Sequence, residues 1–210
     1  MADAVILSNG TPPPREALAR AVRAATLFIC ADGGANVARE YGLTPAAIVG
    51  DLDSARPETL VHFKHIPVHR DPDTERTDTE KAIEFVLERG PFAKVTIFGA
   101  SEGRLDHVLG HLGLLRKYHA RTRLELEDAH GRAYVARKEA RLELPPGTVV
   151  SFFAVGGPAE GVTTENLRFA LHNRTLALGA QDSISNVVER SPAVIRIGTG
   201  EILIVEVTRP

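Results

Sequence analysis

The stretch from Ala31 to Ser54, ADGGANVAREYGLTPAAIVGDLDS, connects two short apolar segments that each end in acidic residues. The first segment leads into Asp32, and the second leads into Asp51 and Asp53. Short apolar runs bounded by glycine and aspartate are typical of buried strands in a parallel sheet. Ligands of open α/β sheets bind beyond the carboxyl ends of the strands. The aspartates are therefore predicted at a ligand site, where carboxylates favour hard cations and phosphate.

Strand patterns alternate with helix patterns from the N-terminus to about residue 120. Strands are expected at 4–8, 27–31, 47–49, 66–69 and 94–98, and helices at 15–25, 35–41, 57–63, 77–89 and 105–118. Such alternation predicts parallel βαβ units with right-handed crossovers. From about residue 122 onward the apolar runs are continuous or have period two, and turn signals such as Pro145-Pro146-Gly147 separate them. This half is predicted to be an antiparallel sandwich.

Two domains are therefore expected, with a boundary between residues 120 and 140. We predict an α/β N-terminal domain with a mostly parallel sheet, residues 1–122, that binds nucleotide and metal. An all-β antiparallel sandwich domain, residues 123–210, is predicted to follow it.

The composition narrows the class of protein. Among 210 residues, 25 basic and 27 acidic side chains nearly cancel, so neither nucleic acid nor a membrane surface is expected as a partner. The single cysteine, Cys30, lies in an apolar run and is expected to be a buried thiol. The first 16 residues contain a four-residue apolar run and no basic region, so no signal peptide is expected. We expect a soluble, cytoplasmic protein.

The pair Asp51 and Asp53 is the strongest candidate for a metal site. Seven of the ten aspartates lie between positions 32 and 106, which favours a site in this half of the chain. In an extended chain, residues two apart point to the same side, so the two carboxylates would repel unless a cation or water separated them. An exposed loop is the alternative. The preceding apolar run favours a metal site, and Mg²⁺ suits one or two carboxylates together with phosphate oxygens.

Asp32-Gly33-Gly34-Ala35-Asn36 has two interpretations. It could be a plain turn between a strand and a helix, with aspartate as the cap and glycine for tight geometry. It could also let a phosphate approach the backbone N–H groups at the start of a helix.

Thr77-Asp78-Thr79-Glu80-Lys81 opens the clearest helix pattern. Thr77 and Glu80 have the spacing of a capping box, and Asp78 would favour the positive end of the helix without any ligand. Asp78 and Lys81 also lie on neighbouring positions of the helix surface, where they could supply a carboxylate for metal or ribose and an ammonium for phosphate. Both interpretations stay open.

Gly103-Arg104-Leu105-Asp106-His107 opens another helix. Arg104 could clamp a phosphate or simply be solvated, and Asp106 could be a cap. His107 and His111 have a spacing that can bind zinc, but no third ligand follows, so packing or surface histidines are expected. The chain contains neither a P-loop nor the glycine pattern of a dinucleotide site after the first strand.

Taken in order, four stretches resemble thiamine pyrophosphokinases (thiamine diphosphokinases). They are residues 31–36, 50–54, 77–82 and 103–107, and Ser185-Asn186 is similar to the serine and asparagine near the family's thiamine pocket. The resemblance covers most of the chain and implies transfer of a pyrophosphoryl group from ATP to the hydroxyl of thiamine, giving thiamine diphosphate and AMP.

The resemblance also implies a set of site residues and a homodimer with the active site at or near the subunit interface. Mg²⁺ would be bound by Asp51, Asp53 and Asp78, and Asp106 would complete the acidic catalytic group. ATP would contact Asp32, Gly33, Gly34, Asn36, Thr77, Asp78, Lys81 and Arg104. Thiamine would contact Asp106, Phe169, Ser185 and Asn186.

Two departures from the family pattern concern the phosphate and thiamine sites. Glu102-Gly103 replaces a pair of glycines before Arg104, and Asn166-Leu167-Arg168-Phe169 replaces a segment that ends in tryptophan. Phe169 would then have to stack on thiamine, or else be an ordinary core aromatic, and Ser185-Asn186 could be a turn. The alternatives to the thiamine assignment are a pyrophosphokinase for another heteroaromatic alcohol, such as a pterin, and a non-catalytic nucleotide sensor.

Overall fold

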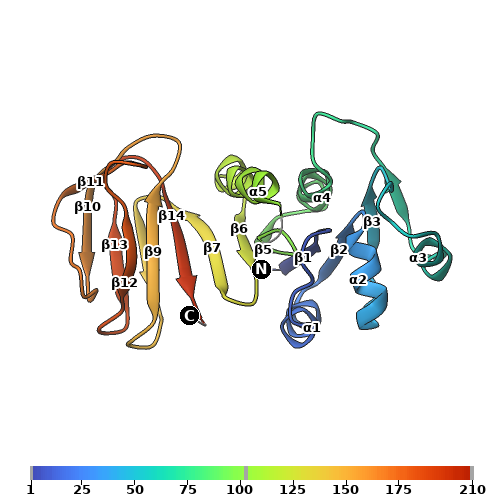
Figure 1. Cartoon of the computed structure of the whole chain (residues 1–210), viewed down its shortest axis with the longest axis horizontal. Coiled ribbons are helices and arrows are strands. Elements are labelled where there is room, and N and C mark those ends of the chain that lie inside the picture. Colours follow the sequence, from blue (N-terminus) through green and yellow to red (C-terminus); the bar gives the residue numbers. More distant parts are fainter. Residues whose placement is uncertain (1, 102–103, 209–210) are drawn as a thin grey trace. The chain divides into compact units, whose positions relative to one another are not determined.

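The computed structural model describes residues 2–101 and 104–208 (Figure 1). The chain forms two compact units, Met1–Ala129 and His130–Pro210. Among the described residues, no helix combines the length and the apolar character that crossing a membrane would need.

The first unit contains a parallel sheet. Its strands are β1 (Ala2–Leu7), β2 (Leu27–Ala31), β3 (Ala47–Gly50), β4 (Val68–Arg70), β5 (Phe92–Phe98) and β6 (Arg123–Glu127). Their order is β6-β5-β1-β2-β3-β4, and each neighbouring pair is parallel. The predicted α/β arrangement with a mostly parallel sheet is confirmed.

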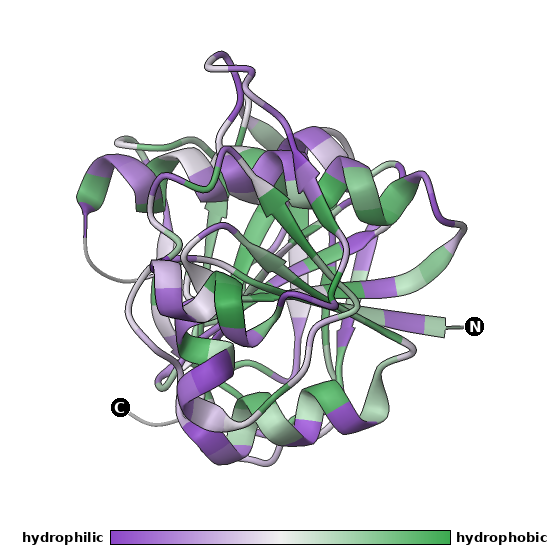
Figure 2. Ribbon diagram, turned by 90° about the vertical axis from the view of Figure 1, so that its right-hand side faces the viewer, coloured by the Kyte–Doolittle hydropathy of each residue, from purple (hydrophilic) through white to green (hydrophobic). Residues whose placement is uncertain are grey.

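The described residues of this unit also form five helices. They are α1 (Arg15–Ala24), α2 (Gly34–Tyr41), α3 (Pro57–His62), α4 (Asp78–Leu87) and α5 (Leu105–Tyr118). Figure 1 shows α4 and α5 on one face of the sheet, and α1 and α2 on the other. In Figure 2 the strands are mostly hydrophobic, whereas the helices carry both colours, as expected for helices with one buried side. Leu7 of β1, Cys30 of β2 and Ile48 of β3 belong to one hydrophobic cluster, which also contains Leu18 of α1.

The second unit, as far as residue 208, contains two antiparallel sheets. Their strands are β7 (Gly131–Ala136), β8 (Glu139–Leu142), β9 (Val149–Ala154), β10 (Ala159–Glu165), β11 (Arg174–Leu176), β12 (Ser183–Val187), β13 (Ala193–Arg196) and β14 (Ile202–Val207). One sheet has the order β12-β9-β14-β7 and the other β11-β10-β13-β8. A single cluster of buried residues includes Phe152 and Ile204 from the first sheet and Val162 and Ile195 from the second. This cluster is the core of the predicted sandwich.

The structure corrects the assignment of one strand near the boundary between the two parts. Residues 123–127 were predicted to begin the sandwich, but they form β6, which pairs in parallel with β5. Along the chain, the first compact unit ends at Ala129 and the second begins at His130. A period-two pattern identifies a strand without identifying its partner, which is why this strand was assigned to the wrong side. Strands β10 and β12 were not predicted, because threonine, serine and glycine interrupt their apolar pattern.

Candidate active site

A cavity of about 570 Å³ lies beyond the carboxyl ends of the strands of the first unit. Its walls come from the segments at and after the ends of β1, β2, β3 and β5, from the first turn of α4 and from the first two turns of α5. The lining residues include Ser8, Asp32, Asp53, Thr77, Asp78, Thr79, Arg104, His107 and His111. This is the position predicted for a ligand of an open parallel sheet.

Three carboxylates meet at this edge of the sheet. One oxygen from each of Asp32, Asp51 and Asp78 lies within 4.8 Å of the others. Asp32 is buried, Asp51 is exposed and Asp78 is half-buried. Carboxylate oxygens at this spacing fit the hard-oxygen coordination that Mg²⁺ and Ca²⁺ require. Mutual repulsion disfavours three charges so close together, and a divalent cation would relieve it.

Asp32 fastens the loop that follows β3. Its carboxylate accepts hydrogen bonds from the backbone N–H of Ser54 and of Ala55, each at 3.1 Å. Burial raises the pKa of the Asp32 carboxyl, and the charges of Asp78 and Asp53 push it the same way, against the hydrogen bonds from Ser54. A cation at the three carboxylates would favour the ionised form of this group.

Asn36 secures the same loop from α2. Its side-chain N–H donates to the carbonyl of Ser54 at 3.0 Å, and its side-chain oxygen accepts from the backbone N–H of Arg56 at 3.0 Å. Both ends of the amide are therefore engaged by backbone. Sequence reasoning placed Asn36 at the nucleotide, and the structure gives it a supporting contact with the loop that carries Asp51 and Asp53.

Gly33 and Gly34 allow α2 to approach β1 closely. A Cβ atom at Gly34 would lie 2.0 Å from the carbonyl oxygen of Leu7, and one at Gly33 would lie 2.3 Å from the side chain of Asn9. Gly33 has ordinary right-handed helical angles, so its requirement for glycine comes from the lack of space. These contacts account for both glycines without a bound phosphate.

Asp51 and Asp53 were predicted to lie on the same side of an extended chain, and the structure shows that they do not. Leu52 between them has a φ of +70°, so the chain turns there. The backbone N–H of Asp53 donates to the Asp51 carboxylate at 3.1 Å, and the Asp53 carboxylate accepts from the Ser54 hydroxyl at 2.8 Å. The turn directs Asp51 into the carboxylate group, whereas Asp53 lines the cavity.

The first turn of α4 supplies both a cap and a charged pair. Thr77 accepts a hydrogen bond from the backbone N–H of Glu80 at 3.3 Å, which confirms the Thr77 half of the predicted capping box. The Glu80 carboxylate accepts from Tyr118 of α5 at 2.8 Å. Lys81 is 4% exposed, and its ammonium donates to the Asp78 carboxylate at 2.9 Å. A positive charge is thereby held beside a carboxylate that lines the cavity.

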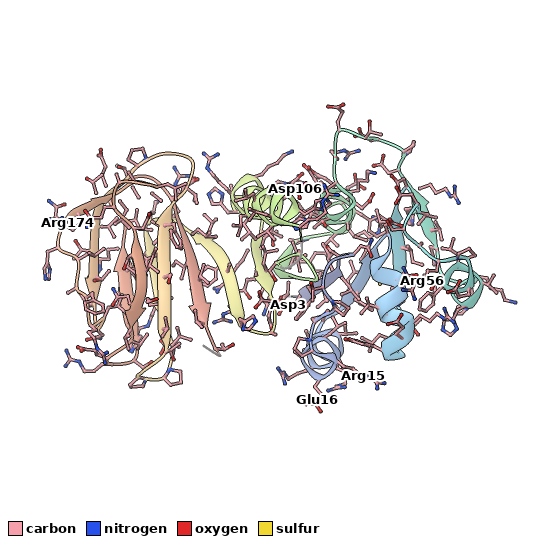
Figure 3. All side chains as sticks on the ribbon, in the orientation of Figure 1. Asp3, Arg15, Glu16, Arg56, Asp106 and Arg174 are labelled. Carbon is pink, nitrogen blue, oxygen red and sulfur yellow. The ribbon has the colours of Figure 1, made fainter. Side chains whose placement is uncertain are left out.

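Arg104 and Asp106 form an exposed pair at the start of α5. Two guanidinium nitrogens of Arg104 donate to the two oxygens of Asp106, at 2.5 and 3.1 Å. These hydrogen bonds lower the pKa of Asp106 to about 2. Asp106, labelled in Figure 3, is tied to Arg104, and Arg104 itself lines the cavity. The altered pair Glu102-Gly103 lies outside the described residues.

Sequence reasoning missed a buried hydrogen-bonded chain in the cavity wall. Ser8 and Thr79 have their hydroxyl oxygens 2.9 Å apart, and the Thr79 hydroxyl lies 3.1 Å from Nε2 of His111. Nδ1 of His111 lies 2.7 Å from the carbonyl oxygen of Ala100. The helical spacing of His107 and His111 singled out the histidine, and packing was the expected role. Ser8 follows an apolar run without any motif, so no local pattern indicates its contact.

In the second unit the structure brings Phe169 and Asn186 together. Asn186 is 1% exposed, and its side-chain amide accepts from the backbone N–H of Phe169 at 3.0 Å and donates to the Phe169 carbonyl at 2.9 Å. The Phe169 side chain is 60% exposed, so it is not a core aromatic. Ser185 has a φ of +55° within β12, and its N–H donates to the Ser151 hydroxyl at 2.9 Å.

Comparison with known protein families places both units. The catalytic domain of thiamin pyrophosphokinase matches residues 18–126, and the vitamin B1 binding domain of thiamin pyrophosphokinase matches residues 136–203. The chain belongs to the thiamin pyrophosphokinase family.

Its relatives within the thiamin pyrophosphokinase family include plant and bacterial proteins. Thiamine pyrophosphokinase 1 of Oryza sativa subsp. japonica is 28% identical over 195 residues, which cover 79% of this chain and 73% of that protein. Thiamine pyrophosphokinase of Bacillus subtilis is 25% identical over 200 residues, covering 87% and 88%. The crystal structure of thiamine pyrophosphokinase from Bacillus subtilis has a TM-score of 0.87 at 22% identity, over 98% of this chain and 99% of that one. The fold is therefore that of thiamin pyrophosphokinase structures.

Proposed function

We propose that this protein is a thiamine diphosphokinase, which transfers the pyrophosphoryl group of ATP to the hydroxyl of thiamine and releases AMP. The observation that carries the proposal is the group of Asp32, Asp51 and Asp78, beside the buried Lys81, at the carboxyl edge of the sheet in the unit that matches the family's catalytic domain. Carboxylates and a nearby ammonium suit a metal-bound polyphosphate.

Mg²⁺ is the proposed metal, with Asp51 and Asp78 as ligands and Asp53 close by. When bound, the ion would neutralise negative charge on the polyphosphate. The fit rests on three carboxylate oxygens within 4.8 Å of one another, a donor set that hard cations favour. Asp32 supports the site by holding the loop after β3, which carries Asp51 and Asp53.

The proposed reaction exchanges one bond to phosphorus for another. The thiamine hydroxyl oxygen attacks the β-phosphorus of ATP in line, the bond from that phosphorus to the oxygen bridging to the α-phosphate breaks, and AMP leaves with the bonding electrons. Arg104 and Lys81 would neutralise charge on the phosphates, since positioning and charge neutralisation dominate phosphoryl transfer. The proposed acceptor for the hydroxyl proton is Asp78, which lines the cavity and is bound to Lys81, or Asp106, which is bound to Arg104.

The remaining substrate contacts are proposed from the family resemblance. Thr77 and the turn at Asp32 are assigned to ATP. Phe169 is assigned to the thiamine ring, because it is an exposed aromatic residue whose backbone is held by Asn186, and an aromatic face suits a cationic ring. A homodimer with its active site at or near the subunit interface belongs to the same proposal. A cytoplasmic location is supported by the single cysteine, Cys30, which is free and buried.

The test is release of AMP from ATP and Mg²⁺, with and without thiamine. We expect thiamine-dependent AMP from the wild-type protein and its loss in Asp51→Asn. Asp71→Asn is the matched control, because Asp71 is bound to Arg76 in the loop between β4 and α4 and is not assigned to the metal. AMP formed with a pterin alcohol but not with thiamine would refute the substrate assignment, and Asn166-Leu167-Arg168-Phe169 makes this the second candidate. ATP binding without AMP from any alcohol would instead support the sensor.

A further inference from the structure

The Ser8–Thr79–His111 chain in the cavity wall has a direction that can be deduced from its last contact. The carbonyl oxygen of Ala100 can only accept, so Nδ1 of His111 carries a hydrogen. Burial lowers the pKa of His111, and the nearby His107 adds to this effect, against the hydrogen bond to Ala100. The ring is therefore neutral near pH 7, and its Nε2 has no hydrogen and accepts.

The direction of the other hydrogen bonds follows from that acceptor. Thr79 must donate its hydroxyl hydrogen to Nε2 of His111. Having no second hydrogen, Thr79 accepts from Ser8, which must donate its own hydroxyl hydrogen to Thr79. Every hydrogen of the chain is thereby used within the chain. The two hydroxyl oxygens, on residues that line the cavity, retain lone pairs only.

We infer that His111 is a positioning residue, which orients the hydroxyls of Ser8 and Thr79 so that this wall offers only hydrogen-bond acceptors to a hydroxyl group of the substrate. A phosphate oxygen is itself an acceptor and would be repelled here. The positive charge of Arg104, which lines another part of the cavity, suits the phosphates. The wall therefore separates the hydroxyl end of a substrate from the phosphate end.

Two kinds of substrate hydroxyl have this chemistry. One is the primary alcohol of thiamine, and the other is a ribose hydroxyl of ATP. The inference rests on the proposed function for the identity of these ligands. It does not rest on that function for the direction of the hydrogen bonds, which follows from the protein alone.

The binding test deletes one partner at a time. Thr79→Val removes the hydroxyl at nearly constant volume, and Thr79→Ser keeps it as the matched control. Calorimetry would compare thiamine with an analogue lacking its hydroxyl, and ATP with its 2′-deoxy and 3′-deoxy analogues. In Thr79→Val and in Ser8→Ala we expect one hydroxyl-bearing ligand to bind about five- to tenfold more weakly, while its deoxy analogue binds as it does to the wild-type protein. Thr79→Ser should restore the difference.

Equal weakening of a hydroxyl-bearing ligand and its deoxy analogue would overturn the inference, because it would reduce the chain to a structural role. Weaker binding of inorganic pyrophosphate to Ser8→Ala would overturn it as well, by assigning this wall to phosphate. The ATP arm needs no turnover, so it decides the matter even if thiamine proves not to be the substrate.

A spectroscopic test uses the wild-type protein, and a variant serves only to assign the signals of His111. Nitrogen-15 NMR of the full chain at neutral pH should show His111 with a hydrogen on Nδ1 and none on Nε2, and His111→Gln would identify the signals. A hydrogen on Nε2, or a cationic ring, would refute the deduced direction whatever the ligand proves to be.

Discussion

Replacing Gly34 with alanine tests the packing that sets the first turn of α2 beside β1. The new Cβ would lie 2.0 Å from the carbonyl oxygen of Leu7, and Cβ atoms essentially never approach another heavy atom within 3.0 Å, so the backbone must move by about 1 Å. Leu7 lies in a central strand, paired with β2 on one side and β5 on the other, and cannot yield easily.

The magnitude follows from two opposing effects. Overpacking costs about 1–3 kcal/mol, and the upper end is expected because backbone has to shift. Alanine returns about 1 kcal/mol through its helix propensity. The net loss of about 2 kcal/mol should lower Tm by roughly 4–8 °C for a chain of this size. Activity should fall as well, because α2 carries Asn36, which holds the loop after β3.

The assay is thermal unfolding followed by calorimetry, with Gly113→Ala as the matched control. Gly113 lies on α5, and a Cβ there would meet nothing within 4 Å. The same substitution should therefore stabilise by about 0.5–1 kcal/mol. A Gly34→Ala protein that melts with the wild type, or a control that loses as much, would refute the packing argument.

Three further outcomes test other parts of the site. Thr77→Ala should cost about 1 kcal/mol in urea unfolding through loss of the α4 cap, and Thr77→Ser should restore most of it. NMR titration should give Asp106 a pKa of about 2 that returns toward 3.8 in Arg104→Gln; because the folded-state value is depressed, the pair's contribution to stability is present above pH 4 and is lost as the pH falls toward 2. A pKa of Asp106 that is the same in Arg104→Gln as in the wild-type protein would contradict the pairing of Arg104 with Asp106. Phe169→Ala should raise the KM for thiamine and leave Tm unchanged, since the ring is 60% exposed, whereas Phe169→Trp should lower KM; a large fall in Tm would contradict the assigned role.

Much of the fold is predictable because local signals and burial agree. Pro57 occupies the first turn of α3, and Gly42, with a φ of +69°, ends α2 in the left-handed conformation. Helix starts and stops of this kind depend on a few neighbouring residues. Strand partners do not, so β6 was assigned to the wrong unit although its apolar alternation was recognised.

The carboxylates were predictable as a group, but their individual arrangement was not. Their place after apolar strands follows from sheet topology. The turn at Leu52, which separates Asp51 from Asp53, and the contact of Asp32 with the loop after β3 depend on tertiary packing. The contact between Ser8 and Thr79 joins residues 71 positions apart, beyond the reach of any local pattern.

The anchoring of the loop after β3 has a consequence for how the protein can vary. Asp32 and Asn36 hold this loop mainly through its backbone, by way of the N–H groups of 54, 55 and 56 and one carbonyl. The side chains of Ser54 and Arg56 are exposed and add to these contacts: Ser54 bonds to Asp53 and Asp32, and Arg56 pairs with Glu40 of α2 at 3.0 Å. Because the donors at 54, 55 and 56 are backbone N–H groups, any residue except proline preserves these hydrogen bonds, so the sequence of the loop can change by design or by evolution while its main anchors stay in place.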